Sequence, residues 1–184
     1  MNTILCVASV EDDTYIREQI AKQTMQPTSI FIHVDKNPAQ GINARRKRIA
    51  KNHEKLVQAV KDLKPDFVWQ LEGDCELPED CLERLIKRTK RPYKCNYISG
   101  IQVGRHGLYC LGAWKNFTPI SFESLNYKLK GVQEVDATGF YCLLARRETW
   151  LSGTCEWNGE PYGPDVVWGR SIKTKKYVDM DIQI

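Results

Sequence analysis

Five carboxylates follow one hydrophobic run in the segment FVWQLEGDCELPED, residues 67–80. The run FVWQL is typical of a buried strand. Glu72 and Asp74 follow it directly, so we expect them at the carboxyl end of that strand. Carboxylate oxygens suit the hard cations Mg²⁺ and Mn²⁺, which usually keep some waters and also bind substrate phosphates. This pattern predicts a divalent-cation site that faces a diphosphate, as in a site for a nucleotide-sugar.

The start of a helix is the alternative explanation for these acids. Pro78 stands early in the helix-like segment LPEDCLERL, and Glu79 and Asp80 suit the positive end of a helix dipole. We accept this explanation for Glu79 and Asp80. It does not account for Glu72 and Asp74, because both precede the helix. We therefore assign the earlier pair to metal or nucleotide contact.

Strand-like and helix-like segments alternate through the first half of the chain. The expected strands are 3–9, 29–35 and 66–72, and the expected helices are 12–24, 43–63 and 78–89. This order predicts an α/β fold in which helices cover a parallel sheet. Further strands are expected at 96–104, 135–146 and 175–184. Ligands of such sheets bind beyond the carboxyl ends of the strands, where the acidic pair is expected.

The helix expected at 43–63 carries its basic residues on different sides. Its apolar residues recur at helical spacing: Ile49, Leu56, Val60 and Leu63. The lysines lie opposite and are expected to be solvated. Arg45 and Arg46 flank the apolar stripe in the first turn, so we expect them near the ligand-binding end of the sheet. His53 falls within the stripe and is expected to be packed rather than catalytic.

Composition indicates one soluble globular domain. The 184 residues suffice for a sizeable core, and no apolar stretch is long enough to span a bilayer. Seven cysteines, none in a C-x-x-C pair, predict free thiols in a reducing compartment, so we expect a cytoplasmic protein. The net charge of +4 is gathered in basic clusters, which fit solvated helix faces, a nucleotide phosphate or a polyanionic partner.

Several segments, taken together and in order, resemble one enzyme family. WQLEGDCELPEDCLERLI is similar to a D-x-D region, with Glu72-Gly73-Asp74 in place of D-x-D. REQIAKQTMQPTSIFIHVDKNP is similar to an opening helix and a strand ending in a nucleotide-contacting Asp, here Asp35. The stretch from Gly41 to Glu72 resembles one whose Arg approaches the nucleotide; Arg45 matches best and Arg46 is a close second. The chain thus resembles glycosyltransferases of the GT-A fold, close to glycosyltransferase family 2.

The second half of the chain extends this resemblance to the acceptor side. VDATGFYCLLARRETW is similar to the family's acceptor-side strand, and YGPDVVWGRSIKTKKYVDMDIQI to the segment with the catalytic Asp, here Asp165. In an inverting transfer Asp165 would take a proton from the acceptor hydroxyl. A helix cap is the alternative role for Asp165. Asp136, in EVDATGF, is the rival base.

The resemblance implies a fold, a donor and a cofactor. It implies a GT-A, Rossmann-like, mixed and mostly parallel sheet flanked by helices, with residues 1–90 binding the nucleotide and 91–184 forming the acceptor side. The donor would be a nucleotide-sugar and the cofactor Mn²⁺ or Mg²⁺. We assign nucleotide binding to Ala8, Asp35, Arg45, Arg46 and Glu72. We assign the metal to Glu72, Asp74 and Glu76.

The acceptor and the catalytic competence stay open at this point. The segment 100–114 resembles phage-encoded and archaeal members of the superfamily, so a modified base of phage DNA is an alternative acceptor. No histidine occupies the position of the family's further metal ligand, which keeps a non-catalytic nucleotide or nucleic-acid binding module as an alternative. A nucleotidyltransferase is disfavoured because VASVEDDTY lacks a Gly-rich phosphate loop. No membrane partner is expected.

Overall fold

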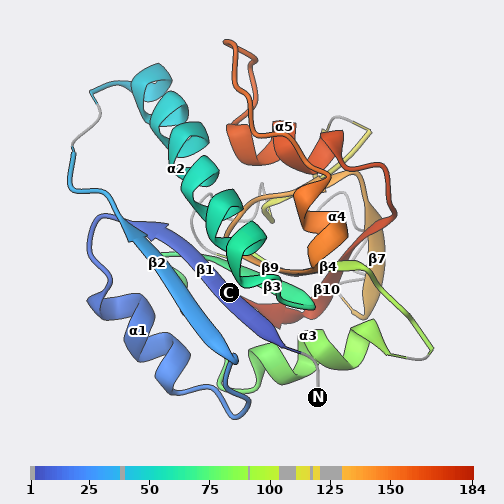
Figure 1. Ribbon diagram of the computed structural model, residues 1–184. Coiled ribbons are helices and arrows are strands. Elements are labelled where there is room, and N and C mark those ends of the chain that lie inside the picture. Colours follow the sequence, from blue (N-terminus) through green and yellow to red (C-terminus); the bar gives the residue numbers. More distant parts are fainter. Residues whose placement is uncertain (1–2, 38–39, 91, 104–110, 117, 121–129) are drawn as a thin grey trace.

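A seven-stranded mixed sheet, with helices on both faces, forms the centre of the molecule in the computed structural model (Figure 1). The structure describes residues 3–37, 40–90, 92–103, 111–116, 118–120 and 130–184. The strand order is β2-β1-β3-β9-β4-β10-β7, and β9 and β7 run opposite to the other strands. These strands are β1 (Ile4–Val10), β2 (Ser29–Val34), β3 (Phe67–Glu72), β4 (Tyr97–Ile101), β7 (Val132–Val135), β9 (Cys142–Arg146) and β10 (Lys176–Gln183).

A smaller sheet joins three short strands in the order β6-β5-β8. They are β5 (Ala113–Lys115), β6 (Thr118–Pro119) and β8 (Ala137–Thr138). The single strand that the sequence predicts over residues 135–146 is therefore wrong. Gly139, which follows β8, donates its backbone N–H to the carbonyl of Gly112, and the chain then enters the large sheet as β9.

Five helices cover the two faces of the large sheet in the described residues (Figure 1). They are α1 (Thr14–Ala21), α2 (Ile42–Leu63), α3 (Cys81–Thr89), α4 (Arg147–Leu151) and α5 (Pro164–Ser171). Alternate residues of β1 pack into different hydrophobic cores, one on each face of the sheet. Cys6 and Ala8 pack with α1 and α3, whereas Leu5 and Val7 pack with α2, α4 and α5. Burial on both faces explains why β1 is a continuous apolar run.

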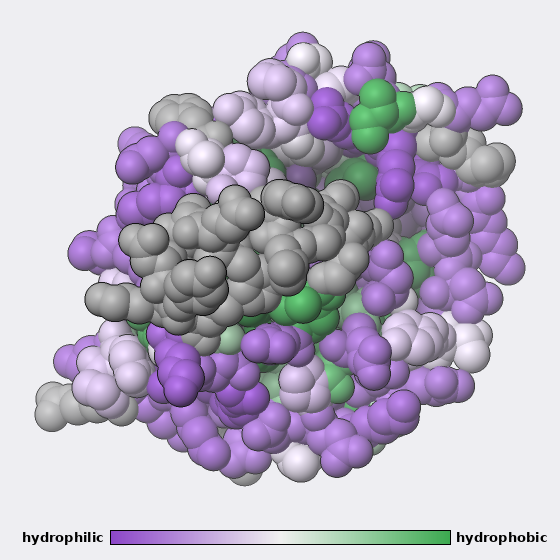
Figure 2. Space-filling model, turned by 180° about the vertical axis from the view of Figure 1, so that it is seen from behind, coloured by the Kyte–Doolittle hydropathy of each residue, from purple (hydrophilic) through white to green (hydrophobic). Residues whose placement is uncertain are grey.

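The face seen from behind (Figure 2) is mainly hydrophilic, and the described cysteines are unpaired. Outside the residues drawn in grey, the face seen in Figure 2 is mainly hydrophilic, with hydrophobic side chains in small patches. Within the described ranges, no helix has the length and apolar character needed to cross a membrane. The six cysteines of these ranges are free thiols, as the sequence predicts.

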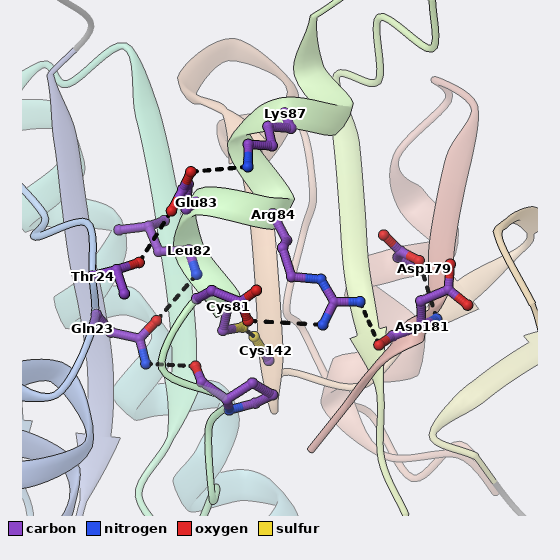
Figure 3. A network of polar contacts seen from close by, with 12 residues as sticks. Gln23, Thr24, Cys81, Leu82, Glu83, Arg84, Lys87, Cys142, Asp179 and Asp181 are labelled. Carbon is purple, nitrogen blue, oxygen red and sulfur yellow. Dashed lines mark hydrogen bonds and ion pairs between the residues drawn. The ribbon is translucent and has the colours of Figure 1, made fainter.

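An ion pair with a buried carboxylate holds α3 to β10. Nε of Arg88 lies 2.7 Å from Oδ2 of Asp179, whose side chain has no solvent exposure. The other carboxylate oxygen of Asp179 accepts the backbone N–H of Asp181 at 3.1 Å. Arg84, one turn earlier on α3, donates to the backbone carbonyl of Asp181 (Figure 3). The helix is therefore held to the sheet through charged groups as well as through its apolar face.

We expect Arg88→Met to lower the free energy of unfolding by about 3 kcal/mol, because it leaves the buried carboxylate of Asp179 without its cation. Urea denaturation measures this difference. Lys87→Met is the matched control on the same helix. Lys87 is 66% exposed and pairs with Glu83 at 2.9 Å, so its loss should change stability by less than about 1 kcal/mol. Equal losses in the two variants would contradict a structural role for this ion pair.

Candidate functional site

A cavity of about 600 Å³ lies where β1, β2 and β3 end, between the sheet and the first half of α2. This size falls within the usual range for small-molecule sites. The lining residues come from segments 9–12, 45–56 and 70–74, together with Asp35 and Phe140. Four of the residues that the sequence assigns to donor or metal binding line it: Asp35, Arg45, Glu72 and Asp74. The structure therefore brings these four together.

Strand register explains this convergence. Ser9 of β1 is paired with Glu72 of β3, and Val10 is paired with Val34 at the end of β2. The three parallel strands therefore end at one level. Glu72 is on the same face of β3 as Val68, which packs in the core beneath α2. Its side chain is consequently on the side of the sheet that α2 covers.

The carboxylate of Asp35 is held by hydrogen bonds. Its Oδ2 accepts from Nδ2 of Asn52 at 2.9 Å, and its Oδ1 accepts from the backbone and side-chain nitrogens of Asn37, both at 3.0 Å. These bonds, with that from Asn52 the largest contribution, lower the pKa of Asp35. A fixed, ionised acceptor therefore stands at the end of β2.

Arg48 is a further cation in the cavity that the sequence prediction missed. Its Nη2 lies 2.6 Å from Oε1 of Glu11, and its Nη1 donates to the backbone carbonyl of Asn37. Arg48 follows Arg45 by three residues, so both are on one side of α2. The three-residue separation of Arg45 and Arg48 was the feature of the sequence that could have pointed to Arg48. The pair of arginines, not Arg45 alone, faces the end of the sheet.

The lining of the cavity is predominantly acidic. The lining contains two arginines and five carboxylates, which are Glu11, Asp12, Asp35, Glu72 and Asp74. The backbone N–H of Thr14 donates to Asp12, which lowers the pKa of that carboxyl and favours its charge. Such a cavity attracts cations and repels a diphosphate unless a cation accompanies it. The charge balance of the lining therefore favours a cation over an unaccompanied anion.

The three acids predicted to bind metal do not form one cluster. Glu72 and Asp74 line the cavity, but Glu76 is exposed and lies outside the lining. Between Asp74 and Glu76, Cys75 is buried and its thiol donates to the carbonyl of Tyr141 at 2.8 Å. In the ranges that the structure describes, no three His, Cys, Asp or Glu side chains are grouped to hold a metal. Two carboxylates with phosphate oxygens and water still match the ligand set of Mg²⁺.

Arg46 and Ala8, both assigned to nucleotide binding from the sequence, lie away from the cavity. The guanidinium of Arg46 sits 5.6 Å from the ring centre of Trp157 and donates to the carbonyl of Pro161 at 3.1 Å. One residue step turns a helix by about 100°, which separates Arg46 from Arg45. Ala8 is fully buried in the core beside α1 and α3, and its neighbour Ser9 lines the cavity instead.

Asp165 lies in the first turn of α5 and is not one of the residues that line the cavity. The N-cap of this helix is Gly163, so the expected alternative of a capping role for Asp165 is wrong. A Cβ built on Gly139 would lie 3.2 Å from Oδ2 of Asp165, and the next residue, Phe140, lines the cavity. Burial raises the pKa of Tyr97, the hydrogen bond with Thr138 lowers it by less, and the nearby charge of Asp165 raises it.

Asp136, the rival base, borders a different cavity. This second cavity, of about 720 Å³, is lined by residues of β7, α5 and the start of β10. Oδ2 of Asp136 accepts the backbone N–H of Asn116 at 2.5 Å, and its Oδ1 lies 3.8 Å from Nζ of Lys115. The two candidate bases therefore have separate surroundings. Residues 104–110 of the segment on which the DNA alternative rests lie outside the described residues.

Gln70 and His53 line the cavity as buried polar residues. Gln70 interrupts the apolar run FVWQL, and this was a signal in the sequence that pointed to it. His53 is packed against aromatic rings, as the helical pattern predicts. Its position in the cavity wall was not predicted, because an apolar stripe alone does not show where a cavity opens.

Comparisons with known proteins give a likeness of fold. No family model matches the chain, and no curated protein matches it significantly. Among solved structures, the crystal structure of A197 from STIV is similar, with a TM-score of 0.59 and 14% sequence identity. The match covers 99% of this chain and 83% of A197. At this identity the likeness concerns the fold alone.

Proposed function

We propose that the protein is a metal-dependent glycosyltransferase of the GT-A type, which transfers a sugar from a nucleotide-sugar donor with inversion. One observation carries the proposal. The cavity at the carboxyl ends of β1, β2 and β3 is lined by four residues that the family resemblance assigns to donor and metal binding: Asp35, Arg45, Glu72 and Asp74. Apart from Phe140, every lining residue belongs to the half that the resemblance assigns to the nucleotide, residues 1–90.

The residues of the cavity fit a diphosphate accompanied by a cation. Glu72 and Asp74 would hold Mg²⁺ or Mn²⁺, and the bound cation would neutralise the departing diphosphate. Arg45 adds a guanidinium, which forms strong hydrogen bonds with phosphate. Asp35 is ionised and fixed by Asn52, so it can accept a hydrogen bond from a donor group of the nucleotide.

A thermal-shift screen with Mn²⁺ tests the proposal. UDP-glucose, GDP-mannose and related donors should raise the melting temperature only when Mn²⁺ is present, since a ligand of the folded state stabilises it. Slow hydrolysis of the bound donor by water should then release the nucleoside diphosphate. Binding without release would favour a non-catalytic nucleotide-binding module. The absence of a shift with every nucleotide-sugar would overturn the proposal.

Arg45 should contribute more to donor binding than Lys51. Arg45 lines the cavity, whereas Lys51, on the same helix, is exposed and outside the lining. A hydrogen bond between charged groups contributes roughly 1.5–3 kcal/mol, so Arg45→Ala should weaken nucleotide binding about 10- to 100-fold. Lys51→Ala should leave it nearly unchanged. Calorimetric titration measures both, and equal losses would contradict the placement of Arg45.

A further inference from the structure

The cavity has a charged rim and a neutral inner end. We define the inner end by four of the buried lining residues: His53, Leu56, Gln70 and Phe140. The carboxylates and arginines of the lining are exposed or only half-buried, so they form the rim. A ligand that fills the cavity therefore meets charge at the opening and neutral groups at the inner end.

His53 is a buried polar side chain in this inner end. Its ring is stacked on Phe140, with 4.8 Å between ring centres and planes 5° apart, and it is 3% exposed. Within the part of the chain that the structure describes, neither Nδ1 nor Nε2 has a hydrogen-bond partner. Buried polar atoms are nearly always hydrogen-bonded in folded proteins. His53, which lines the cavity, therefore has hydrogen-bonding capacity that no described residue uses.

The hydrogen-bonding character of the inner end is that of neutral groups. Burial lowers the pKa of His53 to about 3, so at neutral pH its ring carries one donor and one acceptor nitrogen. Oε1 of Gln70 accepts from Nε1 of Trp150 at 2.9 Å, which fixes the carboxamide. The Nε2 group of Gln70 is then a positioned donor. Together these side chains match a group that has both donors and acceptors and no charge.

We propose that the inner end binds the nucleobase of the donor and that His53 hydrogen-bonds to its polar edge, which makes His53 a determinant of nucleotide specificity. This inference rests on the proposed function. The diphosphate must reach the cation held at the rim by Glu72 and Asp74. The sugar must remain open to its acceptor, which excludes the buried inner end. The ribose and the base remain, and of these only the base has flat apolar faces, which suit Leu56 and Phe140.

His53→Phe tests the inference, because it keeps a ring for stacking and removes both nitrogens. Calorimetric titration with UDP, GDP and ADP, each with Mn²⁺, should show one preferred nucleotide for the wild type. The variant should bind that nucleotide about tenfold more weakly and discriminate less among the three. Binding of inorganic pyrophosphate with Mn²⁺ should not change. His33→Phe makes the same substitution on β2, outside the cavity lining, and should bind every probe as the wild type does.

The outcomes separate this inference from the proposed function. If His53→Phe binds the preferred nucleotide as tightly as the wild type, the inference is wrong and the proposed function stands. If the wild type binds none of the three nucleotides, both are wrong. A measurement on the wild type does not depend on the variant folding. The ¹⁵N shifts of the His53 ring should change when the preferred nucleotide saturates the protein, and unchanged shifts would overturn the inference.

Discussion

Asp74→Asn is expected to abolish metal-dependent binding of a nucleoside diphosphate and to leave the fold intact. Asp74 follows the end of β3, is exposed and lines the cavity with Glu72. Asn keeps the shape of the side chain but replaces an anionic ligand by a neutral amide. Loss of an outer partner of a metal ligand already weakens metal binding about 10- to 100-fold, so loss of a ligand should cost at least about 100-fold. Calorimetric titration with UDP or GDP, with and without Mn²⁺, measures this loss of affinity.

Glu76→Gln is the matched control, since it also removes one negative charge from the loop after β3. Glu76 is exposed and lies outside the cavity, so we expect nucleotide binding close to that of the wild type. A general electrostatic effect would weaken binding in both variants alike. Metal-dependent affinity that stays at the wild-type level in Asp74→Asn would rule out Asp74 as a metal ligand.

The sequence predicts the first half of the fold and the core of the site because both depend on local patterns. The alternation of apolar runs and amphipathic segments predicts β1, β2, β3, α1, α2 and α3 within a few residues. Once these strands are parallel, their carboxyl ends must meet at one edge of the sheet. Asp35 and Glu72, which end their strands or follow them directly, then come together without any further information.

The second half depends on contacts between distant segments, and local patterns do not specify them. β9 is inserted antiparallel between β3 and β4, which places residues 142–146 beside 67–71. The apolar run YCLLA is equally compatible with either strand direction. The break between β8 and β9 depends on the pairing of Gly139 with Gly112 in another loop. A single strand over 135–146 was therefore predicted where the structure has two.

Side-chain direction is the other limit of the sequence prediction. Arg45 and Arg46 flank the same apolar stripe, but the rotation of α2 on the sheet decides which of them faces the cavity. That rotation is set by the packing of Leu56 and Val60 against β1 and by the contact of Arg46 with Trp157. Residues 111 positions apart along the chain thus determine which arginine belongs to the site, and no local spacing contains that information.

Asp165→Asn is expected to lower the rate of sugar transfer about 10²- to 10⁴-fold while nucleotide binding stays at the wild-type level. This range is the usual contribution of a general base, and Asn cannot accept the proton of the acceptor hydroxyl. Asp165 is not the cap of α5, since Gly163 has that position, so the variant keeps the start of the helix. Loss of the charge from the first turn should reduce stability by only roughly 0.3–1 kcal/mol.

Asp136→Asn separates the two candidate bases, because it makes the same change in the second cavity. Asp136 contacts Lys115 and the backbone of Asn116 and lines the second cavity, whereas Asp165 lies close to Gly139, the neighbour of Phe140 in the donor cavity. We therefore expect Asp136→Asn to retain most of the turnover. Single-turnover kinetics with a bound nucleotide-sugar measures transfer apart from donor binding. If Asp165→Asn stays active while Asp136→Asn is inactive, the base belongs to the second cavity, and the acceptor must approach between β7 and α5.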